Sequence, residues 1–187
     1  MTGDGSTTSG GGVAPAAAPG RVALIPGVLA LLPQHASLED PIADLRAAVL
    51  RAAAWLSEDV EILATAQGRR VAESVLAART TTGGPGRSVL VVANGSACRT
   101  EKAPGFLDER AEAFDAALAR ALTAPDPDAL RALDGGLAQE LWADVAALPA
   151  LADALAPGAR TVAVDHDAAP YGVQYWVVRW ACPQGGA

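Results

Sequence analysis

The sequence predicts a three-layer α/β domain with a mainly parallel sheet and a C-terminal strand pair. Short apolar segments alternate with segments in which apolar residues recur at helical spacing, and this alternation is typical of βαβ units. Two further strand-like segments close the chain. The short connection between them, HDAAPY, favours a hairpin that adds an antiparallel edge to the sheet.

The composition indicates one folded domain after a polar tail. The chain has 187 residues, of which 51% are hydrophobic, which is enough for a sizeable core. Residues 1–20 consist mainly of Gly, Ser, Thr, Ala and Pro and offer little surface to bury, so we expect a flexible tail. Residues 21–187 are then expected to form a single α/β domain.

The charge balance narrows the classes of partner. A formal net charge of −7 opposes binding to nucleic acid or to an anionic membrane, because both carry negative phosphates. No apolar run is long enough to cross a bilayer, and the N-terminus lacks the pattern of a secretory signal. Cys98 and Cys182 form no CxxC pair. We therefore expect reduced thiols and a cytoplasmic protein.

Three strands are expected in the first half of the chain, at Arg21–Ile25, Val60–Thr65 and Ser88–Ala93. The third is the most apolar, so we expect it inside the sheet with both faces covered. The glycines of TTTGGPGR, residues 80–87, precede that strand instead of following it. They therefore predict a turn and not a phosphate-binding loop.

The expected helices follow the apolar periodicity and the capping signals. They span Pro41–Ser57, Arg69–Arg79, Asp108–Leu122, a short segment from Asp126-Pro127, and Leu137–Leu148, which Pro149 interrupts before Leu151–Leu155. Asp134-Gly135-Gly136 is expected to separate the last two. The closing strands are expected at Thr161–Asp165 and Gly172–Trp180, with Trp176 and Trp180 packing on one face.

The loop after the third strand is the best candidate for a ligand site. It holds Asn94, Ser96, Arg99 and Lys102, and Lys102 is the only lysine in the chain. Ligands of open α/β sheets bind beyond the carboxyl ends of the strands, and two cations with amide and hydroxyl donors suit an anionic or phenolic compound. The alternative is a polar loop whose arginine is neutralised by a carboxylate at the start of the next helix, Asp108-Glu109.

Other reactive side chains give weaker signals. Ser96 lacks the flanking glycines of the Gly-x-Ser-x-Gly elbow, which disfavours a serine hydrolase. Cys98 is more simply explained as a buried, inert thiol. His35 and His166, with a carboxylate such as Asp165 or Asp167, could supply a two-histidine iron site, although no spacing motif links them.

Residues 95–115, GSACRTEKAPGFLDERAEAFD, resemble the Gly-Ser-x-x-Arg…Lys-Ala-Pro-Gly-aromatic-Leu-Asp-Glu-Arg…Phe-Asp segment of one branch of the class III extradiol ring-cleavage dioxygenases. This branch is the beta-subunit-like family, whose members are similar to the beta chain of protocatechuate 4,5-dioxygenase. DAAPYGVQYWVVRW, at the C-terminal end, resembles the family's closing Ala-Pro-Tyr-Gly-Val-x-Tyr segment, which adds Tyr171 to the candidate ligand-binding residues. VALIPGVLALLPQ lies where the family has Val-Pro-His-Pro-Pro-Leu-Leu-Val-Pro.

The resemblance implies an α/β fold and, in active members, a ferrous ion held by two histidines and a glutamate, with another histidine as acid and base. The first ligand histidine falls on Gly27 and the acid/base histidine on Ala97. After the second strand, where another ligand is implied, the chain has only Ala64-Thr65-Ala66-Gln67-Gly68, and this region is shorter than in the family. Glycine and alanine can neither ligate iron nor transfer protons.

We therefore expect a divergent, shortened member of this family, a pseudoenzyme without an iron site or ring-cleavage activity, that keeps a small-ligand pocket. No catalytic or metal-binding residue and no cofactor is predicted. Two alternatives stay open. One is an active non-haem iron oxidoreductase, with Fe(II) rebuilt on His35, His166 and a carboxylate. The other is a non-catalytic interaction subunit, in a homo- or hetero-oligomer.

Overall fold

The structure, a computed structural model, describes residues 18–35, 40–155 and 157–183. Its strands are β1 (Arg21–Ile25), β2 (Asp59–Leu63), β3 (Arg87–Val92), β4 (Arg160–Ala168) and β5 (Tyr175–Ala181). Its α-helices are α1 (Ala43–Trp55), α2 (Ala66–Ala78), α3 (Arg110–Thr123), α4 (Pro127–Arg131), α5 (Gly135–Glu140) and α6 (Leu148–Ala154). Three short 3-10 helices are η1 (Leu29–Leu31), η2 (Pro33–His35) and η3 (Pro170–Gly172). The expected flexible tail lies outside the described residues as far as position 17.

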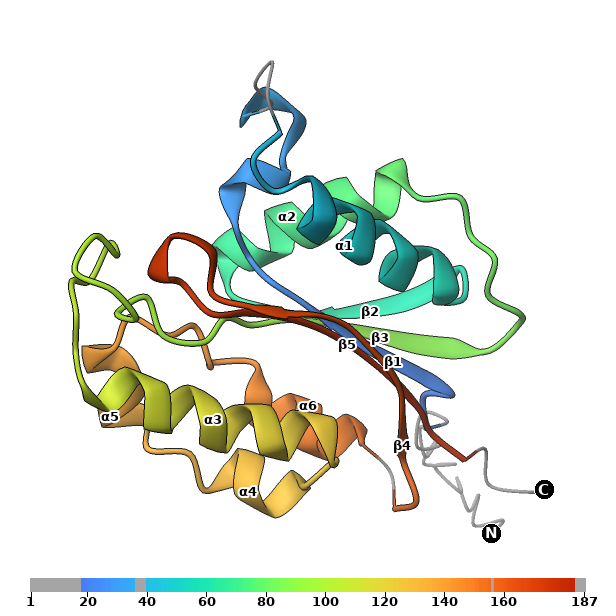
Figure 1. The fold of residues 1–187 in the computed structure, drawn as a ribbon. Coiled ribbons are helices and arrows are strands. Elements are labelled where there is room, and N and C mark those ends of the chain that lie inside the picture. Colours follow the sequence, from blue (N-terminus) through green and yellow to red (C-terminus); the bar gives the residue numbers. More distant parts are fainter. Residues whose placement is uncertain (1–17, 36–39, 156, 184–187) are drawn as a thin grey trace, which may run out of the picture.

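The five strands form one mixed sheet in the order β2-β3-β1-β5-β4 (Figure 1). β1 and β2 both pair with β3 in parallel, whereas β5 is antiparallel to β1 and to β4. The expected α/β class and the antiparallel C-terminal edge are therefore confirmed. β3 lies inside the sheet, as its continuous apolar sequence predicts.

Two layers of helices cover the sheet, with α1 and α2 on one face and α3 to α6 on the other (Figure 1). Alternation along the strands divides the core between these faces. Val22 and Leu24 of β1 pack in the core under α3 and α6, together with Trp176 and Trp180 of β5. Ala23 and Ile25 of β1 face the other way and pack in the core under α1 and α2. The two tryptophans are thus packing residues, as expected.

The largest error in the expected elements concerns the segment after α4. Asp134 lies between α4 and α5, as expected, but Gly135 and Gly136 already belong to α5, because the Asp134 carboxylate caps this helix by accepting the backbone N–H groups of Gly136 and Leu137. α5 then ends at Glu140 instead of continuing to Leu148. Trp142 adopts a positive φ of 58°, which a helix cannot accommodate. The chain resumes in α6, where Pro149 lies in the first turn instead of interrupting a helix.

Smaller errors in the expected elements concern the start of α2 and the end of β4. α2 begins at Ala66, earlier than expected, because the Thr65 hydroxyl accepts the backbone N–H of Gly68 at 3.3 Å. β4 extends to Ala168, three residues beyond the expected end at Asp165, and it contains two register irregularities. None of the described helices is long and apolar enough to cross a membrane.

The topology brings four loops to one edge of the sheet. The loops after β1, β2 and β3 meet there, together with the connection from β4 to β5. After β1 the chain turns to the face of α1, whereas after β3 it turns to the face of α3 (Figure 1). The crevice between the carboxyl ends of β1 and β3 is therefore the switch point at which such sheets usually bind ligands.

Candidate functional site

The crevice between β1 and β3 is closed by contacts within the chain. The Asn94 side-chain oxygen accepts the backbone N–H of Gly27 at 2.9 Å, across the switch point. Gln67 donates from its side chain to the Gly27 carbonyl at 3.3 Å. A β-carbon added to Gly27 would lie 3.1 Å from Cγ1 of Val92, so this position has little room for a larger residue. The Asn94 side-chain oxygen is therefore already used in a hydrogen bond within the domain and is not directed at a ligand.

A second set of contacts closes the same crevice from the α5–α6 segment. The Asp144 carbonyl accepts the backbone N–H of Asn94 at 2.9 Å, and the Asp144 carboxylate accepts the Thr65 hydroxyl at 3.2 Å. Asp144 thus joins the loops after β2 and β3. These hydrogen bonds hold the loops after β2 and β3 together at the switch point, where ligands of such sheets usually bind.

Ser96 and Arg99 converge on a buried carboxylate, Asp115 of α3. Ser96 is fully buried, and its hydroxyl and its backbone N–H donate to the two Asp115 oxygens at 2.6 and 2.8 Å. The Arg99 guanidinium lies 3.3 Å from the same carboxylate. A buried carboxylate is costly unless it is paired and hydrogen-bonded, and this loop satisfies both conditions.

The network continues to the hairpin between β4 and β5. Arg99 also donates to the side-chain oxygen of Gln174 at 3.5 Å, and Gln174 donates to Asp167 at 2.9 Å. The backbone N–H of Arg99 donates to the Gly172 carbonyl at 3.1 Å. Arg99 therefore fastens the loop to both α3 and the hairpin.

Neutralisation of Arg99 by the next helix is found, but by other residues than expected. Asp115 and, at 3.9 Å, Glu112 face Arg99. Asp108, at the start of the helix, pairs with Arg110 at 2.7 Å instead. Hydrogen bonds from the Arg110 side chain lower the pKa of the Asp108 carboxyl to about 2.

Lys102 and Tyr171 lie in a different setting. Both side chains are exposed, and both line an open hollow of about 510 Å³ formed by the loop after β3 and the turn of the hairpin. Among the described residues, Lys102 has no ion-pair partner within 4.0 Å. A free ammonium group and a phenol hydroxyl thus border one space.

The five predicted ligand-binding residues therefore occupy three places. Asn94 spans the closed crevice, Ser96 and Arg99 belong to the buried network, and Lys102 and Tyr171 border the open hollow. The sequence brings all but one of them into a single loop. The structure does not bring them into a single pocket.

Cys98 lies in the same loop and is 1% exposed. Burial raises the pKa of its thiol, and the nearby carboxylates of Asp108 and Asp115 raise it further. A neutral, enclosed thiol is a poor nucleophile, which agrees with the interpretation of Cys98 as inert.

The two histidines lie in different elements, His35 in η2 and His166 in β4. His35 is exposed. The His166 Nε2 atom is buried without a hydrogen-bond partner, and burial lowers the pKa of this histidine. Within the described residues, no group of three or more histidine, cysteine or acidic side chains is arranged to hold a metal ion. Ala97, at the implied acid/base position, is 7% exposed.

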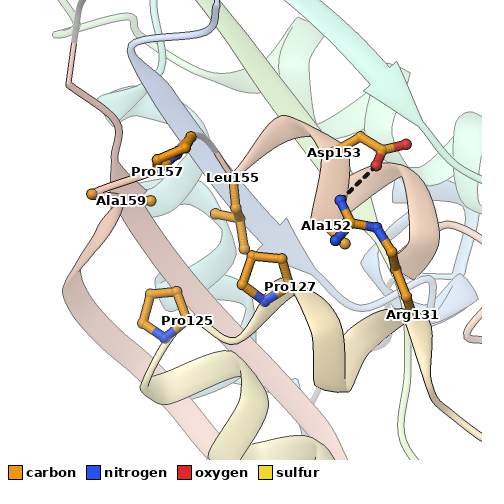
Figure 2. Close-up of a pocket in the computed structure, with 9 residues that line it drawn as sticks. Pro125, Pro127, Arg131, Ala152, Asp153, Leu155, Pro157 and Ala159 are labelled. Atoms are coloured by element: carbon orange, nitrogen blue, oxygen red, sulfur yellow. Dashed lines mark hydrogen bonds and ion pairs between the residues drawn. The ribbon is translucent and has the colours of Figure 1, made fainter.

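A further hollow, of about 320 Å³, lies between α4, the end of α6 and the start of β4, at the opposite edge of the sheet (Figure 2). Pro125, Pro127 and Pro157 line it, and its two charged groups, Arg131 and Asp153, pair with each other at 2.8 Å. None of the predicted site residues borders it, and the Arg131–Asp153 pair offers little net charge to a ligand.

Two polar residues of the network were missed in the sequence, Asp115 and Gln174. Asp115 had a visible signal, since it lies four residues after Ala111 and three before Leu118, on the buried face of α3. An acid in such a stripe requires a partner from elsewhere in the fold. Gln174 gave no comparable signal.

No model of a known protein family matches the chain, and a comparison with curated proteins finds no match.

Proposed function

We propose that this chain is a divergent, non-catalytic relative of the beta-subunit-like class III extradiol dioxygenases that binds a small anionic or phenolic compound. The resemblance of residues 95–115 suggests the relationship. The binding site we propose is the hollow bordered by Lys102 and Tyr171. Asn94, Ser96 and Arg99 are assigned a supporting role, because they fix the loop that carries Lys102.

The observation that carries this proposal is that Lys102, without an ion-pair partner among the described residues, and the exposed Tyr171 line one open hollow, together with Glu101. Lys102 attracts a carboxylate, a phosphate or a phenolate without first breaking an internal ion pair. Tyr171 adds a donor and an aromatic face. Arg99 would have to release buried Asp115 before it could do the same, at a cost of several kcal/mol.

The absence of catalysis is proposed on separate grounds. Gly27 and Ala97 stand where the resemblance implies a ligand histidine and an acid/base histidine. The space around Gly27 is occupied by Val92, so the neighbouring side chain would have to move to admit a histidine. Neither residue can perform the expected chemistry.

The binding experiment uses 4-hydroxybenzoate, benzoate and phenol as probes in isothermal titration calorimetry. We expect 4-hydroxybenzoate to bind most tightly, and Lys102→Met to weaken it about tenfold, because an ammonium–carboxylate contact is lost. Arg120→Met removes an exposed cation at the other end of α3 and serves as the matched control. Equal loss in both variants, or no binding of any probe, would contradict the proposed site.

The metal experiment measures the iron content of protein purified without oxygen, together with catechol cleavage. We expect neither stoichiometric iron nor cleavage. Bound iron that disappears in the His35→Ala, His166→Ala double variant would instead establish the rebuilt metalloenzyme.

A further inference from the structure

Three large apolar side chains are exposed in and beside the loop after β3. Phe106, Leu107 and Trp142 are 74%, 53% and 64% exposed, and we call them the aromatic patch. Trp142 and the loop are neighbours, since a β-carbon added to Gly105 would lie 3.5 Å from Cδ2 of Trp142. Figure 1 shows this loop and the end of α5 at the same end of the molecule. Grouped exposed apolar side chains mark an interaction site far more often than scattered ones do.

Two residues of the patch adopt a left-handed backbone conformation. Phe106 and Trp142 have φ values of 62° and 58°, and the only other non-glycine residue with a positive φ in the described part of the chain is Tyr171. This conformation costs a bulky residue about 1–2 kcal/mol, and glycine would adopt it more easily. Burial in the core compensates neither ring for this cost. At Trp142 the left-handed conformation closes the C-terminus of α5, where the N–H groups of Trp142 and Ala143 donate to the Gln139 and Ala138 carbonyls. Phe106 ends no helix, and strain at an exposed aromatic residue of this kind points to a role in binding.

The charges around the patch decide which partner fits. Asp108 and Glu109 follow Leu107 directly, and Glu140 lies two residues before Trp142. Arg110 lies 2.7 Å from both Asp108 and Glu140 and joins the two sides of the patch. Two carboxylates thus flank one guanidinium, and Glu109 next to Asp108 leaves the group with a net negative charge. We call these four residues the acidic rim.

We infer that the aromatic patch binds a basic polypeptide segment that carries arginine or lysine beside apolar residues. The acidic rim attracts such a segment, and exposed tryptophan and phenylalanine rings bind guanidinium groups over their faces. A second copy of this chain would bring a second acidic rim against the first, and an anionic membrane would meet the same repulsion. The patch and the hollow at Lys102 are separate sites, so this inference does not rest on the proposed ligand.

The test uses a fluorescent, amidated peptide of alternating arginine and leucine, with an alternating glutamate and leucine peptide for comparison. In fluorescence anisotropy, we expect the basic peptide alone to bind, and to bind more weakly as salt is raised from about 20 to 300 mM. Trp142→Ala should weaken binding at least tenfold, as truncation of a central aromatic residue does in other interfaces. Trp142→Tyr should retain most of the affinity, which separates a binding defect from misfolding.

Two control variants locate the effect. Val164→Ala truncates an exposed apolar residue of β4 and should change the affinity less than twofold. Lys102→Met should leave peptide binding intact, so failure of the ligand proposal and failure of this one remain distinguishable. Several outcomes would overturn the inference: no binding of the basic peptide, equal binding of the acidic peptide, or equal loss in Val164→Ala. Dimerisation that Trp142→Ala abolishes, or Trp142-dependent binding to phosphatidylglycerol vesicles, would also overturn it by assigning the patch to another occupant.

Discussion

The two ends of one loop have opposite relations to solvent. Ser96 and Arg99 are drawn inward by Asp115, whereas Lys102 and Phe106 point into the solvent only a few residues later. Similar polar side chains in the sequence thus serve different purposes. The buried end holds the loop in place, and the exposed end is free to meet a ligand or a partner.

The largest effect is expected at the buried end, from Asp115→Ala. This variant leaves the Ser96 hydroxyl and N–H without an acceptor and removes the buried carboxylate that pairs with Arg99, which should cost about 3 kcal/mol or more in the free energy of unfolding. Urea denaturation followed by circular dichroism measures it. Asp128→Ala, at an almost fully exposed carboxylate, should change the stability by less than about 0.5 kcal/mol. Similar free energies of unfolding for the two variants would show that the buried Asp115 network does not stabilise the domain more than an exposed carboxylate does.

A smaller effect is expected from Asn94→Ala in the closed crevice. The Gly27 N–H loses its acceptor in this variant, and we expect a loss of about 1–2 kcal/mol. Gln67→Ala breaks a longer bond made by an exposed side chain and should cost less than about 0.5 kcal/mol. If Asn94→Ala were as stable as the unmodified protein in the same urea titration, the crevice would not be closed by this contact.

At the exposed end of the loop, we expect a substitution that increases the free energy of unfolding instead of lowering it. Trp142→Gly relieves a left-handed backbone at a residue with little burial, so we expect a gain of roughly 0.5–1 kcal/mol. Leu107→Gly is the matched control, since Leu107 is 53% exposed and has no positive φ. It should lose about 0.5–1 kcal/mol, because glycine gains more freedom on unfolding. A loss in Trp142→Gly would show that the ring stabilises the domain.

The smallest effect is expected from the exposed pair of Asp108 and Arg110, and it depends on pH. The folded pKa of Asp108 is about 2, below its ordinary value of 3.8. The ion pair therefore stabilises the fold fully above pH ~4, and this contribution is lost as the pH falls through ~2. The difference in Tm between the unmodified protein and Arg110→Gln should shrink across that window. Arg120→Gln should show no such trend, and a constant difference for Arg110→Gln would contradict the assigned pairing.

Much of the architecture follows from local pattern. β1 has the expected bounds, Arg21–Ile25, because a short β-branched run before Pro-Gly leaves little choice. The three-layer arrangement follows from alternating strands and amphipathic helices. The location of the polar loop at the carboxyl edge also follows, since the topology sends every loop of this kind there.

What could not be foreseen depends on contacts between distant segments. The Arg99 side chain is held inward by Asp115 and Gln174, and neither residue lies within ten positions of it in the sequence. The end of α5 is decided by the left-handed conformation of Trp142, which no propensity of tryptophan suggests. Apolar periodicity across residues 137–148 favours a helix there, and tertiary hydrogen bonds override it. The N–H of Asn94 bonded to the Asp144 carbonyl is one of these.

The position of β1 has a consequence for how the chain folds. Among the strands of the described residues, β1 is the first along the chain and also the middle strand of the sheet. One of its two neighbours is β5, the last of these strands, with Val22 opposite Trp180. Nearly the whole domain must be present before this ladder can close, which places the protein among folds dominated by distant contacts, with folding times in the range of milliseconds to seconds. Until β5 arrives, β1 presents an open apolar edge. A chain emerging from the ribosome therefore carries this unpaired strand edge, a site where chains can aggregate, until β5 has been made.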